Sequence, residues 1–161
     1  MVISKLSMPE SNNQSYNHLK IHTQYSICEG AIKIDNLKNF CKENKIPCLG
    51  LSDTSNLCGA LEFAENISKV GTQPIIGTQI YFRFEDTTGL LPLIALNEKG
   101  YKRIIELSSR SYLENDALSD PHLDIQELLR DMEGVSLLSG TIHGLFGKLF
   151  EKGRLDEITK I

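Results

Sequence analysis

Short apolar segments alternate with helical patterns along most of this chain, and the connections between them are short. Residues 48–51 and 91–96 are almost continuously apolar, as expected for strands that are buried on both faces of a sheet. Each is followed by a helical pattern, over residues 56–71 and 99–113, in which apolar positions recur every three or four residues. This alternation predicts an α/β fold with mainly parallel strands.

The same patterns predict the remaining elements. Strands are expected at residues 18–22, 74–84 and 134–140, helices at residues 35–45 and 122–132, and short helical pieces from residue 144 onward. Asp35 is expected to cap the first helix, and Asp124 stands three residues before Glu127, as in a capping box. A complete (βα) barrel needs about 250 residues. The 161 residues therefore predict either a small open sheet or part of a longer protein.

Composition and charge argue against several classes of protein. Hydrophobic residues make up 40% of the chain, enough for a packed core. The net charge of −4 argues against a broad nucleic-acid-binding surface, which requires a basic excess. No apolar run approaches the roughly 20 residues of a membrane span, so no membrane contact is expected. Residues 1–17 are interpreted as a flexible polar leader, which leaves residues 18–161 as one domain.

Cysteine spacing indicates the compartment. None of the four cysteines forms a C-x-x-C pair, so the usual zinc-binding spacing is absent. Two of them lie in apolar patterns and are expected to be small core residues. These features favour a reducing cytoplasm over an oxidising compartment.

Polar side chains stand where the expected strands end. His22 ends the first strand, Asp53 follows the apolar residues of the second, and Gln79 lies in the third. The carboxyl ends of parallel strands share one edge, so these three residues could converge there. An Asp after a strand is also an ordinary turn former or helix cap. Both interpretations of Asp53 remain open at this stage.

A metal centre at this edge would need several histidine and carboxylate ligands around a bridging water. The edge supplies only His22 and Asp53 of those types. Of the neighbouring candidates, Lys20 would repel a cation, Thr54 is a poor ligand and Gln79 is a weak neutral one. The sequence therefore predicts no metal cluster here.

Several segments resemble, in order and spacing, the motifs of the PHP (polymerase and histidinol phosphatase) domain. The opening motifs are HLKIHTQYSICEGAIKIDNL, PCLGLSDTSNLCGALEF and QPIIGTQIYF, and the later ones are LIALNEKGYKRIIELSSRSYLE and EGVSLLSG. The resemblance is specifically to the PHP domain at the N-terminus of the bacterial DNA polymerase III α subunit. It runs from about His18 to the end of the chain, and it implies the first part of a distorted (βα)7 barrel.

The resemblance also implies a degenerate metal site. Metal-binding PHP domains begin with a His-x-His pair where this chain has Lys20 and His22. They continue with Asp-His where it has Asp53 and Thr54, and with a glutamate where it has Gln79. His22 and Asp53 would then be vestigial. We expect Asp53 to accept hydrogen bonds in the turn into the helix at residues 56–70, and Lys20 to pair with Asp53.

The function implied is that of a non-catalytic scaffold in DNA replication, which stabilises the polymerase and docks the proofreading exonuclease subunit. DNA polymerase (nucleotidyltransferase) activity and its Mg²⁺ would lie outside this chain, which would need no cofactor and would meet DNA only through the full polymerase. One alternative is an active metal-dependent phosphoesterase or 3′–5′ exonuclease, which metal analysis would distinguish. Another is an unrelated small α/β binding protein, although no glycine-rich phosphate loop is present.

Overall fold

The computed structural model describes residues 16–116, 118–159 and 161, so residues 1–15 of the expected leader lie outside the described part. The elements follow one another as α1 (Ile34–Asn44), β1 (Cys48–Thr54), α2 (Ala60–Ser68), β2 (Gln73–Phe84), β3 (Thr87–Ala95), α3 (Glu98–Leu113), β4 (Leu123–Asp124), α4 (Ile125–Leu129), β5 (Val135–Leu137), α5 (Leu145–Glu151) and α6 (Leu155–Ile158). No helix in the described part is long and apolar enough to cross a membrane.

The sheet has the order β1-β2-β3-β5, and β4 pairs with β2. The α/β class is confirmed, and β1 is parallel to β2 as expected. The helix expected at residues 122–132 is shorter, because residues 123–124 form β4, which pairs in parallel with β2. By contrast, β3 is antiparallel to both β2 and β5. Only Glu85 and Asp86 separate β2 from β3, a length that allows a hairpin but no crossover helix. The expected first strand reduces to a short extended segment that pairs with β1 at Ile21.

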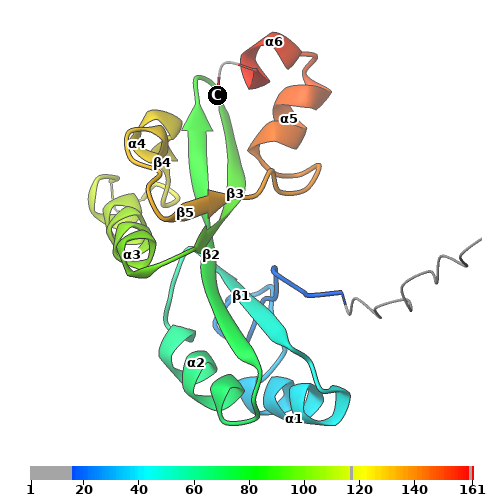
Figure 1. The fold of residues 1–161 in the computed structure, drawn as a ribbon. Helices are drawn as coiled ribbons and strands as arrows, with labels where there is room; N and C mark the ends of the chain where they lie inside the picture. Colours follow the sequence, from blue (N-terminus) through cyan, green and yellow to red (C-terminus); the bar gives the residue numbers. More distant parts are fainter. Residues whose placement is uncertain (1–15, 117, 160) are drawn as a thin grey trace, which may run out of the picture.

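The hydrophobic core forms two clusters along one face of the sheet. The N-terminal cluster joins β1 to α1 and α2 through Ile34, Leu37, Cys41, Leu49, Leu51, Ala60, Phe63 and Ile67. The C-terminal cluster joins β2 and β3 to the later elements through Ile80, Phe82, Leu91, Leu93, Ile104, Leu107, Leu123, Ile125, Leu128, Val135, Leu145 and Leu149. Leu57 packs against both clusters. Figure 1 shows β2 running from the α1–α2 end of the molecule to the end that carries α3–α6.

Helix caps agree with the sequence in one case and differ in another. Asp124 caps α4, where its side chain accepts a hydrogen bond from the backbone N–H of Gln126. The capping-box role of Glu127 is not observed, because its carboxylate contacts Arg110 and Arg130 instead. The expected cap at Asp35 is wrong, because α1 begins one residue earlier and Lys33 occupies the N-cap position without a side-chain hydrogen bond. Asp35 instead lies in the first turn, where its negative charge favours the helix dipole.

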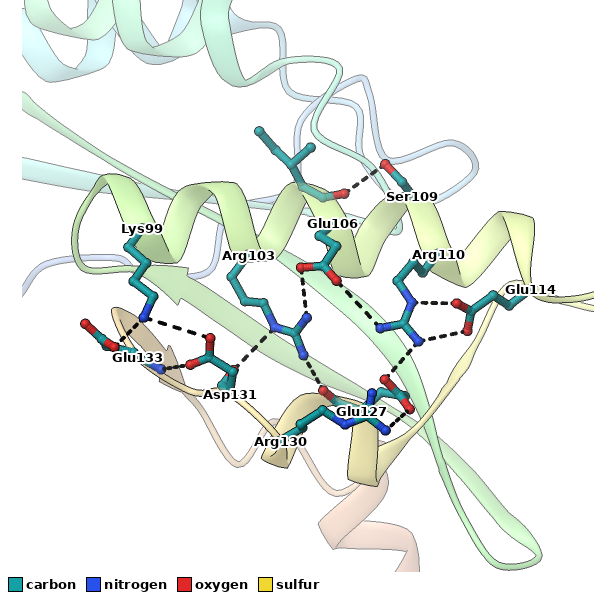
Figure 2. Close-up of polar contacts among 11 residues, drawn as sticks. Lys99, Arg103, Glu106, Ser109, Arg110, Glu114, Glu127, Arg130, Asp131 and Glu133 are labelled. Carbon is teal, nitrogen blue, oxygen red and sulfur yellow. Dashed lines mark hydrogen bonds and ion pairs between the residues drawn. The ribbon is translucent and has the colours of Figure 1, made fainter.

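Two arginines of α3 fasten this helix to α4 and the turn that follows it (Figure 2). The Arg103 guanidinium donates to the backbone carbonyls of Glu127 and Asp131, and it pairs with Glu106 at 2.9 Å. Arg110 donates to Glu114 and lies 2.8 Å from Glu127 Oε2, a contact that is an ion pair without hydrogen-bond geometry. The Arg103 side chain is 10% exposed and that of Arg110 is 25% exposed.

Arg154 holds the tip of the β2–β3 hairpin against α6. Its guanidinium pairs with Glu85 and with Asp86, the latter at 2.5 Å, and Lys152 lies 3.3 Å from the same Asp86 carboxylate. The hydrogen bond from Arg154, helped by those from Thr87 and Lys152, lowers the pKa of Asp86 to about 2. The hairpin tip is therefore anchored by charge on a solvent-exposed surface.

Candidate functional site

Asp53, at the end of β1, is fully buried and accepts three hydrogen bonds. The Thr23 backbone N–H donates at 2.6 Å and the Thr23 hydroxyl at 2.7 Å, while the Ser26 hydroxyl donates at 2.7 Å. Asp53 is thus a hydrogen-bond acceptor, as expected, but the turn that it holds is the one at residues 23–26. The expectation that it serves the turn into the following helix is wrong.

The expected ion pair between Lys20 and Asp53 is absent from the described structure. Side chains alternate between the two faces of a sheet. Because Ile21 pairs with Leu51, Lys20 lies on the face opposite to Asp53. There Lys20 lines a small cavity with Pro92 and His143. The register of the extended segment, which the sequence does not specify, separates the two charges.

Thr54 and Gln79 pair directly across β1 and β2 and share the face opposite to Asp53. The Gln79 side-chain amide Nε2 donates to the Thr54 hydroxyl oxygen at 2.7 Å. The Thr54 hydroxyl in turn donates to the Glu29 carboxylate. Gln79 is only 3% exposed, and its Oε1 is buried without a hydrogen-bond partner.

Glu29 is the residue that sequence reasoning missed. It lies in the loop at residues 24–30, far from any predicted strand end. The available signal was Gly30, beside it. A Cβ at Gly30 would lie 2.0 Å from the Thr23 carbonyl oxygen, so only glycine lets the loop approach this closely and bring Glu29 to the strand ends.

His22 is partly buried, and its Nδ1 lies 3.4 Å from the Ser26 hydroxyl oxygen. Burial lowers the pKa of His22, and the positive charge of Lys20 lowers it further, while Glu29 and Asp53 oppose the shift. The imidazole is therefore held in its neutral form near neutral pH. Ser26 links His22 to Asp53, whereas Gln79 belongs to the separate set with Thr54 and Glu29.

These side chains do not fit the metal cluster that the resemblance implies for metal-binding members. The part of the chain that the structure describes contains no group of three His, Cys, Asp or Glu residues placed to hold an ion. Both side-chain oxygens of Asp53 accept hydrogen bonds from Thr23 or Ser26. The Glu29 carboxylate accepts a hydrogen bond from the Thr54 hydroxyl. A multinuclear hydrolytic centre needs more free anionic and imidazole ligands than remain here.

Comparison with known proteins agrees with the sequence motifs. A family model described as the PHP domain matches residues 18–161. The chain is 36% identical over 159 residues to a DNA polymerase III subunit alpha of Caulobacter vibrioides, which covers 93% of the chain and 14% of that protein. A DNA polymerase III subunit alpha of Rickettsia felis is 36% identical over 132 residues, covering 81% of the chain and 11% of that protein.

The chain thus spans only a small part of the length of these polymerase relatives. Among solved structures, an amidohydrolase from Chromobacterium violaceum superposes with a TM-score of 0.50 at 14% sequence identity. The match covers 60% of the chain and 33% of that structure. This likeness concerns the fold alone and agrees with part of a PHP-type barrel.

Proposed function

The chain belongs to the PHP domain family, and we propose that it is the N-terminal PHP region of a replicative DNA polymerase III α subunit. The observation that carries this proposal is the match to two α subunits across 81–93% of the chain. The nucleotidyltransferase activity and its Mg²⁺ belong to parts of such a subunit that this chain does not include. The chain itself is non-catalytic and works in the cytoplasm.

Its role is that of a scaffold, which stabilises the polymerase subunit and docks the proofreading exonuclease subunit. Three features of the strand-end site support this role: Asp53 serves a turn, Thr54 and Gln79 bind each other and Glu29, and Lys20 adds a positive charge nearby. The net charge of −4 gives no general counterion-release drive toward DNA. Contact with DNA therefore comes through the complete polymerase.

Binding and activity assays on the full-length protein test this proposal. We expect primer extension by the full-length protein and none by the 161-residue chain. Calorimetry should show binding of the exonuclease subunit by the full-length protein. Removal of 3′ nucleotides should be absent when that subunit is absent.

Two outcomes would count against the proposal. Failure of the full-length protein to extend a primer would reject the polymerase assignment. Metal-dependent 3′ degradation that disappears in His22→Ala, but persists in the control variant His143→Ala at an exposed loop position, would replace the scaffold with an active PHP nuclease.

A further inference from the structure

The end of β1 holds one loop from both faces of the sheet. Asp53, on the helix-covered face, fixes Thr23 and Ser26 at the start of the loop. Its neighbour Thr54, on the opposite face, holds Glu29 near the end of the same loop. Two consecutive residues thus hold the loop through different hydrogen bonds, because consecutive side chains point to opposite faces.

The direction of the hydrogen bonds on the Thr54 side is fixed by proton count. The Thr54 hydroxyl carries one proton, and the Glu29 carboxylate can only accept, so this proton goes to Glu29. Thr54 must then accept from the side-chain Nε2 of Gln79. This assignment turns Gln79 Oε1 away from Thr54, and Oε1 has no hydrogen-bond partner in the described structure.

The three side chains come from three separate segments: the loop at residues 24–30, β1 and β2. A metal cluster joins distant segments in the same way, by taking ligands from each of them. Here the joining groups are a neutral amide, a hydroxyl and one carboxylate, so the set offers a divalent ion a single anionic ligand. The three segments are therefore joined by hydrogen bonds alone.

We propose that the hydrogen-bonded set Gln79–Thr54–Glu29 replaces a metal cluster as the structural tie at the strand ends. It anchors the loop at residues 24–30 to β1 and β2, and it offers a divalent cation only one carboxylate, that of Glu29. The inference rests on the proposed non-catalytic role and specifies how the site is held together in that role.

Amide hydrogen exchange of the full-length protein tests the tie locally. Thr54→Val removes the hydroxyl with little change of shape, and we expect exchange across residues 24–30 to become roughly tenfold faster, as loss of a hydrogen bond to a charged group predicts. Glu29→Gln should act in the same direction, and the double variant should add little to Thr54→Val, because both break the same bond. Matched controls are Thr88→Val on β3 and Glu65→Gln on α2, which should leave this loop unchanged.

Metal titration supplies the second readout. Addition of Zn²⁺ or Mn²⁺ should leave exchange at residues 24–30 of the wild-type protein unchanged. Slower exchange with stoichiometric metal, or Thr54→Val behaving like its control, would overturn the proposal. Neither result depends on primer extension or exonuclease binding, so failure of the tie and failure of the proposed function are told apart.

Discussion

At the scale of single residues, the buried carboxylate of Asp53 and the exposed carboxylate of Asp86 stabilise the fold through different interactions. Asp53 is sealed from water and accepts three hydrogen bonds from residues about thirty positions earlier in the chain. Asp86 lies in solvent and is held by two cations from the C-terminal end. The first should matter to stability through its buried hydrogen bonds, whereas the contribution of the second should be present near neutral pH and lost in acid.

Replacing Asp53 by alanine should lower the free energy of unfolding by about 3 kcal/mol, because it leaves the buried Thr23 N–H and the Ser26 hydroxyl without their acceptor. Asp53→Asn keeps one acceptor oxygen and should cost about half as much. Urea unfolding measures both. The control Asp35→Ala, at an exposed position in α1, should cost under about 1 kcal/mol. Equal effects of the two alanine variants would contradict the role given to Asp53.

The lowered pKa of Asp86 predicts how stability depends on pH. Its pKa falls from 3.8 to about 2 on folding, chiefly through the hydrogen bond from Arg154. Its contribution is therefore complete above about pH 4 and is lost as the pH falls to about 2. The difference in unfolding midpoint between wild type and Asp86→Asn should be constant near neutral pH and vanish by about pH 2.

The same measurement on Glu43→Gln provides the comparison. Glu43 is exposed on α1 and has no ion-pair partner among the residues that the structure describes. Glu43→Gln therefore shows what the loss of one negative charge on the surface does to the unfolding midpoint without a paired cation. A constant difference for Asp86→Asn down to about pH 2 would show that Arg154 does not act on this carboxylate.

At the scale of elements, α3 is positioned by one close backbone contact and by its arginines. A Cβ at Gly100 would lie 1.7 Å from the Gly134 carbonyl oxygen. Glycine in a helix normally costs about 1 kcal/mol relative to alanine. Here alanine should be the less stable residue, because a Cβ at position 100 must push α3 away from the turn before β5. Gly100→Ala should therefore lower the free energy of unfolding by about 1–3 kcal/mol. Ser109→Ala, on the exposed side of the same helix, is the control, and thermal unfolding of both variants decides the sign.

The two arginines of α3 should differ in strength and in salt dependence. Arg103→Met removes the donor to two backbone carbonyls from a nearly buried position and should cost about 1–3 kcal/mol. Arg110→Met removes more exposed ion pairs and should cost about 0–1 kcal/mol, with less effect in high salt. Urea unfolding at low and high salt separates the two. A larger loss for Arg110 would reverse this ranking.

Elements with strong periodicity were predictable from the sequence, and relations between elements were not. The helix expected at residues 99–113 and the strand expected at residues 74–84 each differ from α3 and β2 by one residue at the start. The register between β1 and the extended segment that pairs with it at Ile21 decides which face of the sheet carries Lys20 and which carries Asp53. No local sequence pattern encodes that register. Glu29 reaches the site through a loop whose shape depends on Gly30, so the bond to Thr54 could not be read from spacing.

At the scale of the whole molecule, β2 connects the two hydrophobic clusters, because its residues pack in both of them. Ile76 packs on the N-terminal cluster, whereas Ile80 and Phe82 belong to the C-terminal cluster. The two clusters should therefore unfold together. Phe63→Ala, in the N-terminal cluster, should cost about 3–5 kcal/mol and should speed hydrogen exchange in α3 as well as in α2.

The control for this variant is Phe40→Ala on α1, where the side chain is 46% exposed. It removes the same ring and should cost much less, with no change of exchange in α3. Fast exchange confined to α1, α2 and β1 in Phe63→Ala would show two independent units instead of one.

The order of the two clusters along the chain has a consequence for synthesis on the ribosome. Every buried member of the N-terminal cluster precedes residue 68, and every buried member of the C-terminal cluster lies between Ile80 and Leu149. At about 5–20 residues per second, a ribosome needs on the order of 3–14 s to make that second stretch. During this interval Ile80 and Phe82, at the growing end of the nascent chain, still lack the helices that will cover them. This apolar half of β2 is then the segment that a ribosome-bound chaperone would meet.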